Sequence, residues 1–358
     1  MISLQNYLSS AKSKVAETSL VVMGNEAADL DSVASSIAYG YLHTLQNPEE
    51  VVLPLMPIAR ADFHLRTEAV FVMKEAGINP EDLIFNDEVD VSSLMTGSGL
   101  VLVDHNTPAP AIEKLNPQVV GIVDHHNDEG KFPQANPRII QTIGSTTSII
   151  ARLFLDADLA VSEELAILLG GTILLDTVNL DDSAGRVTDA DKEMAAMLLP
   201  LCPLPQEDFF ARVQEAKFSV QGLSTNDLLR KDYKEWVLGK TKCGIGSALI
   251  PITDWAQMDD DLASGFAAFS ESRQLDMLLS MNAFTNPDFQ RNLVISTKDE
   301  AELDKLVTHL QEKGLELEPV TIEGQKDTDA MCIKFFVQGN LGISRKKMQP
   351  ILAEYFED

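Results

Sequence analysis

Acidic and histidine side chains follow apolar stretches at four places in the first half of the chain. The four segments are NEAADLDS at 25–32, VDHN at 103–106, VDHH at 123–126 and LLDTVN at 174–179. Each sets an ionisable group directly after apolar residues, where a carboxylate is poorly solvated unless a positive charge compensates it. Because carboxylates that converge at one edge of a sheet repel one another, divalent cations are the simplest compensation. The four segments together therefore predict a metal centre.

Each of these motifs alone also has an ordinary structural explanation. A single Asp after a strand usually caps a helix or a turn, and Asp31 or Asp176 by itself is typical of such positions. The adjacent histidines of the VDHH segment are harder to explain in this way, and all four motifs in one chain favour the metal centre. The histidines outside the motifs lie in amphipathic or loop contexts and are expected to be structural or surface residues: His43, His64 and His309.

Short apolar strands that alternate with helical patterns must position these groups. Strands are expected at 20–23, 51–55, 100–103 and 119–123, helices at 33–45, 67–76 and 145–155, and a further buried strand ending at Asp176. Nearly continuous apolar strands separated by helices imply a mainly parallel sheet that is covered on both faces. We therefore expect a doubly wound α/β domain, whose ligands bind at the carboxyl ends of the strands.

The alternation of apolar strands and helical patterns ends after Asn179. Residues 1–195 are expected to form the metal-binding domain and residues 196–222 a linker, because residues 200–205 read PLCPLP. Residues 223–358 are expected to form a smaller mixed α/β domain. Its strands are predicted at 232–238, 243–250, 275–281, 293–296 and 331–337, and its helices at 301–313 and 346–356.

The composition excludes several classes of function. The 358 residues carry 55 acidic and 28 basic side chains, a formal net charge of −27, which argues against binding to nucleic acid or to anionic membranes. No apolar run is long enough to span a bilayer, and the N-terminus lacks the features of a secretory signal. A cytoplasmic protein is expected, and a monomer, since no coiled coil is visible. An anionic substrate would need metal ions or a basic pocket to overcome the negative field.

The order of the four motifs resembles that of the phosphoesterase superfamily named after its Asp-His-His motif. Within it, the chain is similar to the branch of eukaryotic exopolyphosphatases and prune-type proteins, and most of all to fungal-type cytosolic exopolyphosphatases. The resemblance covers almost the whole chain. It includes DLLRKDYK at 227–234 and GISRKKMQP at 342–350, which resemble substrate-binding segments of this branch and of manganese-dependent pyrophosphatases.

The resemblance implies a centre for two divalent cations. Asp104 would bridge the two ions, and the remaining ligands would be Asp29 on one ion and Asp31, His125 and Asp176 on the other. Such a pair of cations would activate the water that attacks the terminal phosphorus. Carboxylate-rich ligation favours Mg²⁺, and the histidine makes Mn²⁺ or Co²⁺ possible substitutes.

Further roles at the site also follow from the resemblance. His126 would contact a substrate phosphate, and Asp124 would orient a neighbouring histidine. Many relatives carry His where this chain has Asn25, whereas the exopolyphosphatase and prune branches share the Asn. Asn25 is therefore expected beside the first metal and the substrate, and it favours these branches over the pyrophosphatases. His105 either touches the site or packs beside it.

The implied activity is the release of terminal phosphate from inorganic polyphosphate. Lys234, Arg345 and Lys346 would hold the anionic chain, with Arg60 and Arg66 as weaker candidates. Two alternatives stay open. The same centre could act on pyrophosphate, short polyphosphates or nucleotides, or the chain could be a prune-like regulatory binding protein. The intact ligand set disfavours the latter.

Overall fold

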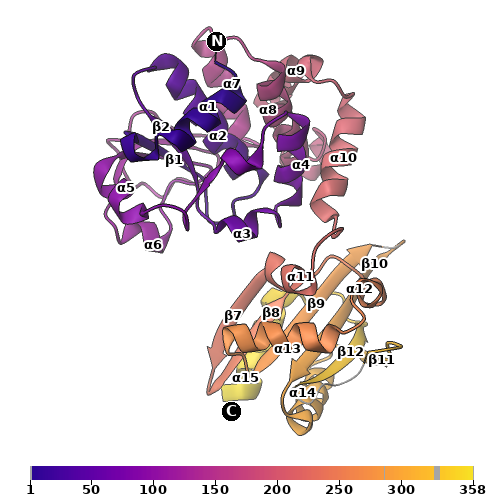
Figure 1. Ribbon diagram of the computed structural model, residues 1–358. Helices are drawn as coiled ribbons and strands as arrows, with labels where there is room; N and C mark the ends of the chain where they lie inside the picture. The colour runs from indigo at the N-terminus through magenta and orange to yellow at the C-terminus, as the bar shows by residue number, and fades with distance from the viewer. Residues whose placement is uncertain (1, 286, 326–330, 358) are drawn as a thin grey trace. The chain divides into compact units, whose positions relative to one another are not determined.

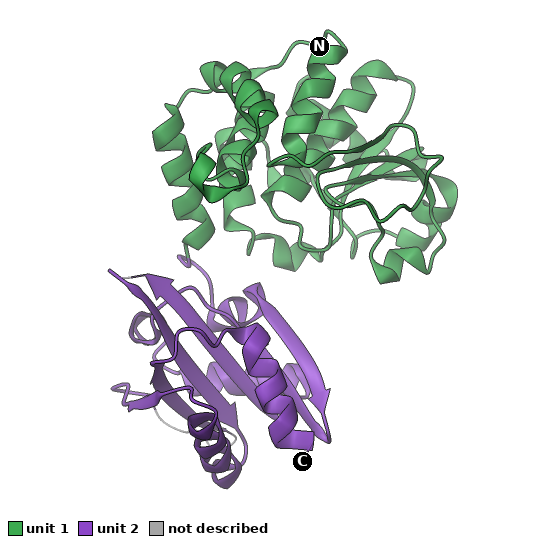
Figure 2. Cartoon of the chain, turned by 180° about the vertical axis from the view of Figure 1, so that it is seen from behind, with its two compact units in different colours: residues 1–219 green, residues 220–358 purple. Residues whose placement is uncertain are grey.

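The chain folds into two compact units, each with a hydrophobic core of its own. The computed structural model describes residues 2–285, 287–325 and 331–357. The units are Met1–Ser219 and Val220–Asp358 (Figure 2). Among the described helices, none is both long enough and apolar enough to cross a membrane.

Unit 1 is built on a six-stranded sheet in which every pair of neighbours is parallel. The strand order is β3-β2-β1-β4-β5-β6. The strands are β1 (Leu20–Met23), β2 (Val52–Met56), β3 (Ile84–Phe85), β4 (Gly99–Val103), β5 (Gln118–Asp124) and β6 (Arg138–Ile140). Four of the five strands predicted for this domain are confirmed, and the short edge strands β3 and β6 add to them.

The helices of unit 1 connect and cover these strands. They are α1 (Leu4–Ser13), α2 (Leu30–Gln46), α3 (Arg60–Phe63), α4 (Thr67–Glu75), α5 (Val91–Gly97), α6 (Pro110–Glu113), α7 (Thr146–Asp156), α8 (Glu163–Asp176), α9 (Asp189–Leu198) and α10 (Gln206–Phe218), with short 3-10 turns η1 (Val15–Glu17), η2 (Pro80–Asp82), η3 (Asp182–Ala184) and η4 (Leu199–Leu201). Helix α2 packs on β1 and β2, and α7 packs on β5 and against α2.

The strand order creates a switch point between β1 and β4. The sheet grows from β1 through β2 to β3 on one side and through β4 to β5 on the other. Because parallel connections are right-handed, the two directions place their crossover helices on opposite faces of the sheet, which is the doubly wound arrangement. Ligands in such sheets bind at the carboxyl ends of the strands beside the switch point. The loops after β1, β4 and β5 meet there, and they carry three of the predicted motifs.

The fourth motif is carried by a helix, and the expectation of a strand before Asp176 was wrong. Asp176 is the last residue of α8, whose residues 165–174 are all buried. An apolar run of this kind does not distinguish a buried strand from a buried helix by periodicity. Gly171 allows close packing, since a Cβ there would lie 2.7 Å from the ring of Phe209.

The expected linker at 196–222 is instead largely helical. Helix α10 lies within it and belongs to unit 1, where Phe209 and Val213 are buried against the core. It packs against α4 and α8. The prolines that suggested a linker lie before the helix, and Pro205 is its N-cap residue, where the missing N–H removes no hydrogen bond within the helix.

Unit 2 contains a mixed sheet of six strands with helices on both faces. The order is β11-β12-β10-β9-β8-β7; β8 and β9 are parallel and the other neighbours are antiparallel. Helix α13 covers one face, and α14 and α15 cover the other (Figures 1 and 2). The strands are β7 (Tyr233–Leu238), β8 (Thr241–Gly246), β9 (Met277–Thr285), β10 (Phe289–Thr297), β11 (Leu317–Val320) and β12 (Cys332–Gln338), and the helices are α11 (Thr225–Lys231), α12 (Ile252–Met258), α13 (Leu262–Arg273), α14 (Glu300–Glu312) and α15 (Arg345–Glu357). The predicted fold class, a doubly wound α/β domain followed by a smaller mixed one, is confirmed.

Candidate metal centre

A pocket of about 420 Å³ opens at the carboxyl edge of the unit 1 sheet. Its walls come from the loops after β1, β4 and β5, from the end of α8 and from the segments before α7 and α9. Seven of the residues singled out in the sequence line it: Asn25, Asp29, Asp31, Asp104, His125, His126 and Asp176. The fold therefore gathers side chains from all four motifs in one place.

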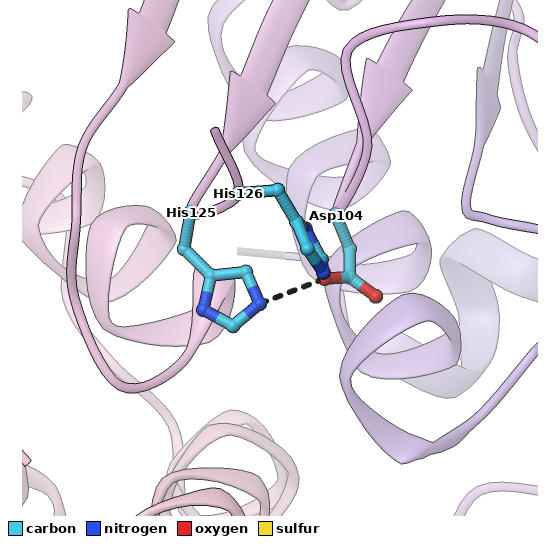
Figure 3. Close-up of side chains that lie close together, drawn as sticks. All are labelled: Asp104, His125 and His126. Carbon is cyan, nitrogen blue, oxygen red and sulfur yellow. Dashed lines mark ion pairs between the residues drawn. The ribbon is translucent and has the colours of Figure 1, made fainter. Parts of the chain in front are cut away.

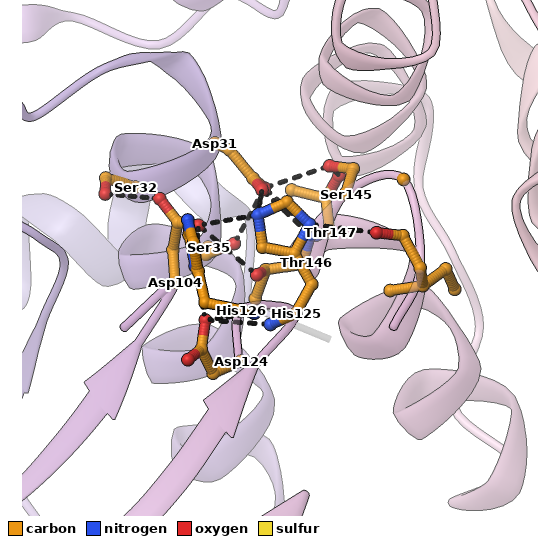
Figure 4. Close-up of polar contacts among 12 residues, drawn as sticks. Asp31, Ser32, Ser35, Asp104, Asp124, His125, His126, Ser145, Thr146 and Thr147 are labelled. Carbon is orange, nitrogen blue, oxygen red and sulfur yellow. Dashed lines mark hydrogen bonds and ion pairs between the residues drawn. The ribbon is translucent and has the colours of Figure 1, made fainter. Parts of the chain in front are cut away.

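Asp104 occupies the centre of the cluster (Figure 4). It follows β4 in a left-handed backbone conformation, with φ of 60°, and only 2% of its surface is exposed. One carboxylate oxygen, Oδ2, accepts hydrogen bonds from Ser32 Oγ at 2.7 Å and from Asn25 Nδ2 at 2.8 Å. The other, Oδ1, lies 3.2 Å from Nε2 of His125. A strained, buried residue of this kind persists only where its surroundings hold it, as they do at functional sites.

Asn25 donates a hydrogen bond to Asp104 through its side-chain amide nitrogen. Its own side-chain oxygen accepts a hydrogen bond from the backbone of Ala27 at 2.8 Å. With that amide orientation, Asn25 orients the Asp104 carboxylate rather than offering an oxygen to the pocket.

Asp31 lies in the first turn of α2 and is held by the start of α7. Its carboxylate accepts from the backbone nitrogens of Thr146, at 2.8 Å, and Thr147, at 3.1 Å, and from Ser145 Oγ at 3.0 Å. The positive end of the α7 dipole stabilises a carboxylate at this position. Burial and the nearby charge of Asp104 act in the other direction and raise the pKa of Asp31 to about 7.

His125 directs its Nε2 atom at the carboxylate of Asp104 (Figure 3). Its Nδ1 lies 3.0 Å from the carbonyl oxygen of Ile143. Since a carbonyl accepts only, Nδ1 carries a proton, and Nε2 is the atom that can bind a metal or a second proton. Nε2 lies 3.2 Å from Asp104 Oδ1 and 3.8 Å from Asp31 Oδ2. Burial lowers the pKa of His125, but the hydrogen bond and charge of Asp104 and the charge of Asp31 outweigh it and raise the pKa to about 10.

His126 lines the pocket beside His125, with the two ring centroids 4.4 Å apart, and is oriented by Asp124. Its Nδ1 lies 2.8 Å from Asp124 Oδ1, and 54% of its side chain is exposed. Asp124, the fully buried last residue of β5, also accepts from the backbone nitrogens of both histidines and from Asn106 Nδ2 at 2.6 Å. The hydrogen bond to Asp124 is the main cause that raises the pKa of His126.

Asp29 and Asp176 complete the acidic set. Asp29 caps α2 through Ser32 N and is exposed to the pocket, yet the surrounding protein and Asp104 raise its pKa. Burial raises the pKa of Asp176 well above its usual value, and the charge of Asp31 adds to this. The Asp176 Oδ2 atom is buried, and it has no hydrogen-bond partner in the described part of the chain.

These observations fit a divalent cation. Four carboxylates converge, the pKa values of Asp29, Asp31 and Asp176 are raised by their mutual charge and by burial, and one carboxylate oxygen has no partner. Ligand atoms of Asp104, His125 and His126 lie within 4.8 Å of one another. A cation would compensate the charge and supply the missing partner of Asp176, and the oxygen-rich set with imidazole suits Mg²⁺ or Mn²⁺.

The remaining predicted residues lie outside this pocket. His105 is largely buried, its Nδ1 lies 2.9 Å from the Val103 carbonyl, and it does not line the pocket. Lys234, Arg345 and Lys346 belong to unit 2. Arg345 donates to the carbonyl and to the carboxylate of Asp232, both at 2.6 Å, which places the start of α15 beside the start of β7.

The sequence motifs did not identify the residues that hold the candidate ligands in place. Among them is Asp191, a fully buried side chain of α9. It accepts from Gly144 N at 2.9 Å, from Ser148 Oγ at 2.6 Å, and from both the backbone and hydroxyl of Thr188 at 2.8 Å. It thereby fixes the segment that binds Asp31 and His125. The capping-box spacing of Thr188 and Asp191 was visible in the sequence, as was the GSTT start of α7, but neither identified a partner across the fold.

Arg60, a weaker candidate for the substrate site, has a structural role. It pairs with Glu88, donates to the carbonyl of Leu83 at 2.7 Å and stacks on Phe85. Arg66 donates to the carbonyl of Ala27 at 2.7 Å, and its charge lowers the pKa of Asp29 in part.

Comparisons with known proteins agree with this architecture. The model of the DHH family N-terminal domain matches residues 19–172, and that of the DHHA2 domain matches residues 211–355. Exopolyphosphatase PRUNE1 of Rattus norvegicus is 32% identical over 98% of this chain and 79% of its own length. A manganese-dependent inorganic pyrophosphatase of Methanothrix thermoacetophila is 27% identical over 73% of this chain and 80% of its own. A solved structure from Methanococcus jannaschii that carries the name of family II inorganic pyrophosphatases shares the fold, with a TM-score of 0.52 and 20% identity over 95% of this chain and all of that one.

Proposed function

The chain belongs to the DHH superfamily, in its prune-related exopolyphosphatase branch, and on this premise we propose that it releases orthophosphate from the ends of inorganic polyphosphate. It is a phosphoanhydride hydrolase. The observation that carries the proposal is the convergence of four carboxylates and two histidines in one pocket, with Asp176 Oδ2 unpartnered among the described residues. Two relatives that are 32% identical over 98% of the chain are named exopolyphosphatases, which supports polyphosphate as the substrate.

Two divalent cations are part of this proposal. Asp29, Asp31, Asp104, His125 and Asp176 would hold them, with Asp104 shared between the two. Mg²⁺ is the proposed ion, and Mn²⁺ or Co²⁺ are substitutes. Cations in such a centre activate water and neutralise charge on phosphoryl oxygens during in-line displacement.

His125 and His126 have different roles in this proposal. The Ile143 carbonyl keeps the His125 Nδ1 protonated and leaves Nε2 for a cation. Asp124 holds Nδ1 of His126 and favours the protonated ring, whose Nε2–H can donate to a phosphoryl oxygen. His126 would therefore bind the phosphoryl group that is to be released and stabilise the charge that develops on it.

Unit 2 would hold the anionic chain through Lys234, Arg345 and Lys346. The first turn of α15 contains three basic residues and no acidic one, an arrangement that opposes the helix dipole. A phosphate bound there would relieve that opposition, and the planar fork of Arg345 can grip two phosphate oxygens. Asp232 holds the guanidinium of Arg345 and would orient it.

The proposal also covers partners, localisation and oligomeric state. The net charge of −27 disfavours nucleic acid as a partner, and we propose a cytoplasmic monomer.

The test is release of orthophosphate in the presence of Mg²⁺ or Mn²⁺. Long-chain polyphosphate, tripolyphosphate, pyrophosphate and a cyclic nucleotide are compared with the same protein. We expect faster turnover of the polyphosphates than of pyrophosphate. The similarity to a manganese-dependent pyrophosphatase makes pyrophosphate the second candidate, and equal or faster hydrolysis of pyrophosphate would reverse the order. Binding of polyphosphate without turnover of any substrate would favour a regulatory binding protein.

A further inference from the structure

Arg186 differs from the other arginines of this acidic chain in lacking a partner among the residues that the structure describes. Of the ten arginines, seven pair with carboxylates, and Arg66 and Arg291 donate to carbonyl oxygens. In the part of the chain that the structure describes, the Arg186 guanidinium makes no hydrogen bond, ion pair or ring contact. Yet it lines the pocket that contains Asp29, Asp31, Asp104 and Asp176. The Arg186 side chain is exposed and pairs with none of the acidic groups beside it. Its hydrogen-bond donors are therefore available to a ligand.

The backbone of Arg186 is held firmly against the metal centre. A Cβ at Gly144 would lie 3.0 Å from the Arg186 carbonyl oxygen and 2.8 Å from Asp191 Oδ2, so the absence of a side chain at 144 permits this close approach. Two residues further on, Thr188 is fixed by two hydrogen bonds to Asp191, which also binds Gly144 N. The same segment, through Ile143, Ser145 and Thr146, orients His125 and Asp31. Arg186 is therefore carried by a loop that is tied to the ligands themselves.

We propose that Arg186 is a substrate-binding residue of unit 1, which contacts phosphoryl oxygens of the substrate in the metal pocket. This inference rests on the proposed hydrolysis of phosphoanhydrides. When cations engage the pocket carboxylates, the guanidinium keeps its donors for an anionic substrate in the same pocket. Its planar fork suits two oxygens of one phosphate, or one oxygen from each of two adjacent phosphates. The pocket of unit 1 then has a positively charged side chain of its own that binds the substrate, independent of the basic residues of unit 2.

The alternative is a solvated surface arginine, and matched variants separate the two. Arg186→Gln removes the charge, Arg186→Lys restores it without the fork, and Arg152→Gln is the control. Arg152 is a half-exposed arginine of α7 that pairs with Glu193 and does not line the pocket. Two readouts are used with Mn²⁺-loaded protein: KM and kcat for tripolyphosphate, and calorimetric binding of methylenediphosphonate, whose P–C–P bridge is not hydrolysed.

For Arg186→Gln we expect a KM for tripolyphosphate and a Kd for methylenediphosphonate that are each raised roughly tenfold, the scale of a charge-assisted contact. Arg186→Lys should recover part of this, Arg152→Gln should stay within about twofold of wild type as an exposed pair does, and the melting temperatures of all variants should agree. Equal constants for Arg186→Gln and Arg152→Gln would overturn the inference, as would failure of the wild type to bind methylenediphosphonate. If the wild type binds it but hydrolyses no polyphosphate, the proposed function fails while the comparison of Kd values still decides the role of Arg186.

Discussion

Two regions carry the charged groups of the proposed site, and they differ in burial and in the number of hydrogen bonds that each group receives. In unit 1, Asp104 and Asp31 are 2% and 4% exposed, and each accepts several hydrogen bonds from fixed donors. In unit 2, Lys234 and Lys346 are exposed, and among the described residues Arg345 donates hydrogen bonds to Asp232 alone.

The difference matches two kinds of task. Groups that hold cations and position a reacting phosphorus need fixed geometry, because small displacements reduce the rate steeply. Groups that hold a repetitive polyanion need charge, and their geometry can vary. The first kind of group lowers the free energy of unfolding, because like charges are buried together and Asp104 adopts a left-handed backbone conformation. The second kind, exposed basic side chains, changes the free energy of unfolding little. Variants in the two regions should therefore differ in size of effect and in which quantity they change.

The largest effect is expected for Asp104→Asn. It removes the charge that faces both Asp31 and His125 and that we propose both cations share. Orthophosphate release should fall on the order of a thousandfold or more, as for other residues that act as a unit in catalysis. Asp208→Asn, an exposed acid of α10, is the control and should retain the wild-type rate. A near-normal rate for Asp104→Asn would remove this residue from the centre of the site.

Asp191→Asn should weaken the site from a distance. The new amide would turn its NH₂ group toward backbone and hydroxyl donors that now give hydrogen bonds to a carboxylate. The free energy of unfolding should fall by about 3 kcal/mol, and Mn²⁺ affinity by about 10- to 100-fold. Urea denaturation and calorimetry measure the two. The exposed neighbour Asp189→Asn is the control, and unchanged Mn²⁺ affinity in Asp191→Asn would show that α9 does not support the ligands.

Cations and protons should compete at Asp31 and His125. The raised pKa of Asp31, about 7, means that the metal-free folded state loses stability as pH rises from about 4 through 7. The raised pKa of His125, about 10, contributes stability that is complete below about 6.5 and is lost as pH rises through 10. Since a cation must displace these protons, the gain in melting temperature from Mn²⁺ should be larger at pH 8 than at pH 6. An equal gain at both values would contradict the competition.

The smallest effect is expected in unit 2. Arg345→Gln should raise KM for polyphosphate about tenfold and leave kcat and the melting temperature nearly unchanged, because it removes a contact to the chain outside the reacting centre. Lys305→Gln, an exposed lysine of α14, serves as the control. A fall in kcat with unchanged KM would place Arg345 in the chemical step and would erase the contrast between the two regions.

The sequence predicted the sheets better than the supporting contacts. Strands such as β1 and β5 were predictable because their apolar runs are short and bounded by polar turns. Asp176 was placed on a strand because a fully buried helix and a buried strand share the same apolar pattern. Residues 206–218 were taken for linker because the apolar face of α10, Phe209 and Val213, is short and interrupted by charge.

The candidate ligands could be read from motifs, but their support could not. Asp191 and Gly144 are distant in sequence, and their contact exists only after α7 and α9 pack against each other. Asn25 illustrates the same limit: the sequence predicted its place beside the first metal and the substrate, but only the fold shows that its amide nitrogen donates to Asp104. Residue types and spacing identify groups that can bind a metal, and tertiary contacts decide their orientation.

Titration with Mn²⁺, followed by electron paramagnetic resonance, tests the metal centre most directly. Free and bound Mn²⁺ are counted for the wild type, for Asp104→Asn and for the Asp208→Asn control. We predict that the wild type and the control bind two ions per chain and that Asp104→Asn loses tight binding of both. Absence of tight binding in the wild type, or the same binding curve for Asp104→Asn, would contradict the assignment of this pocket as a metal centre.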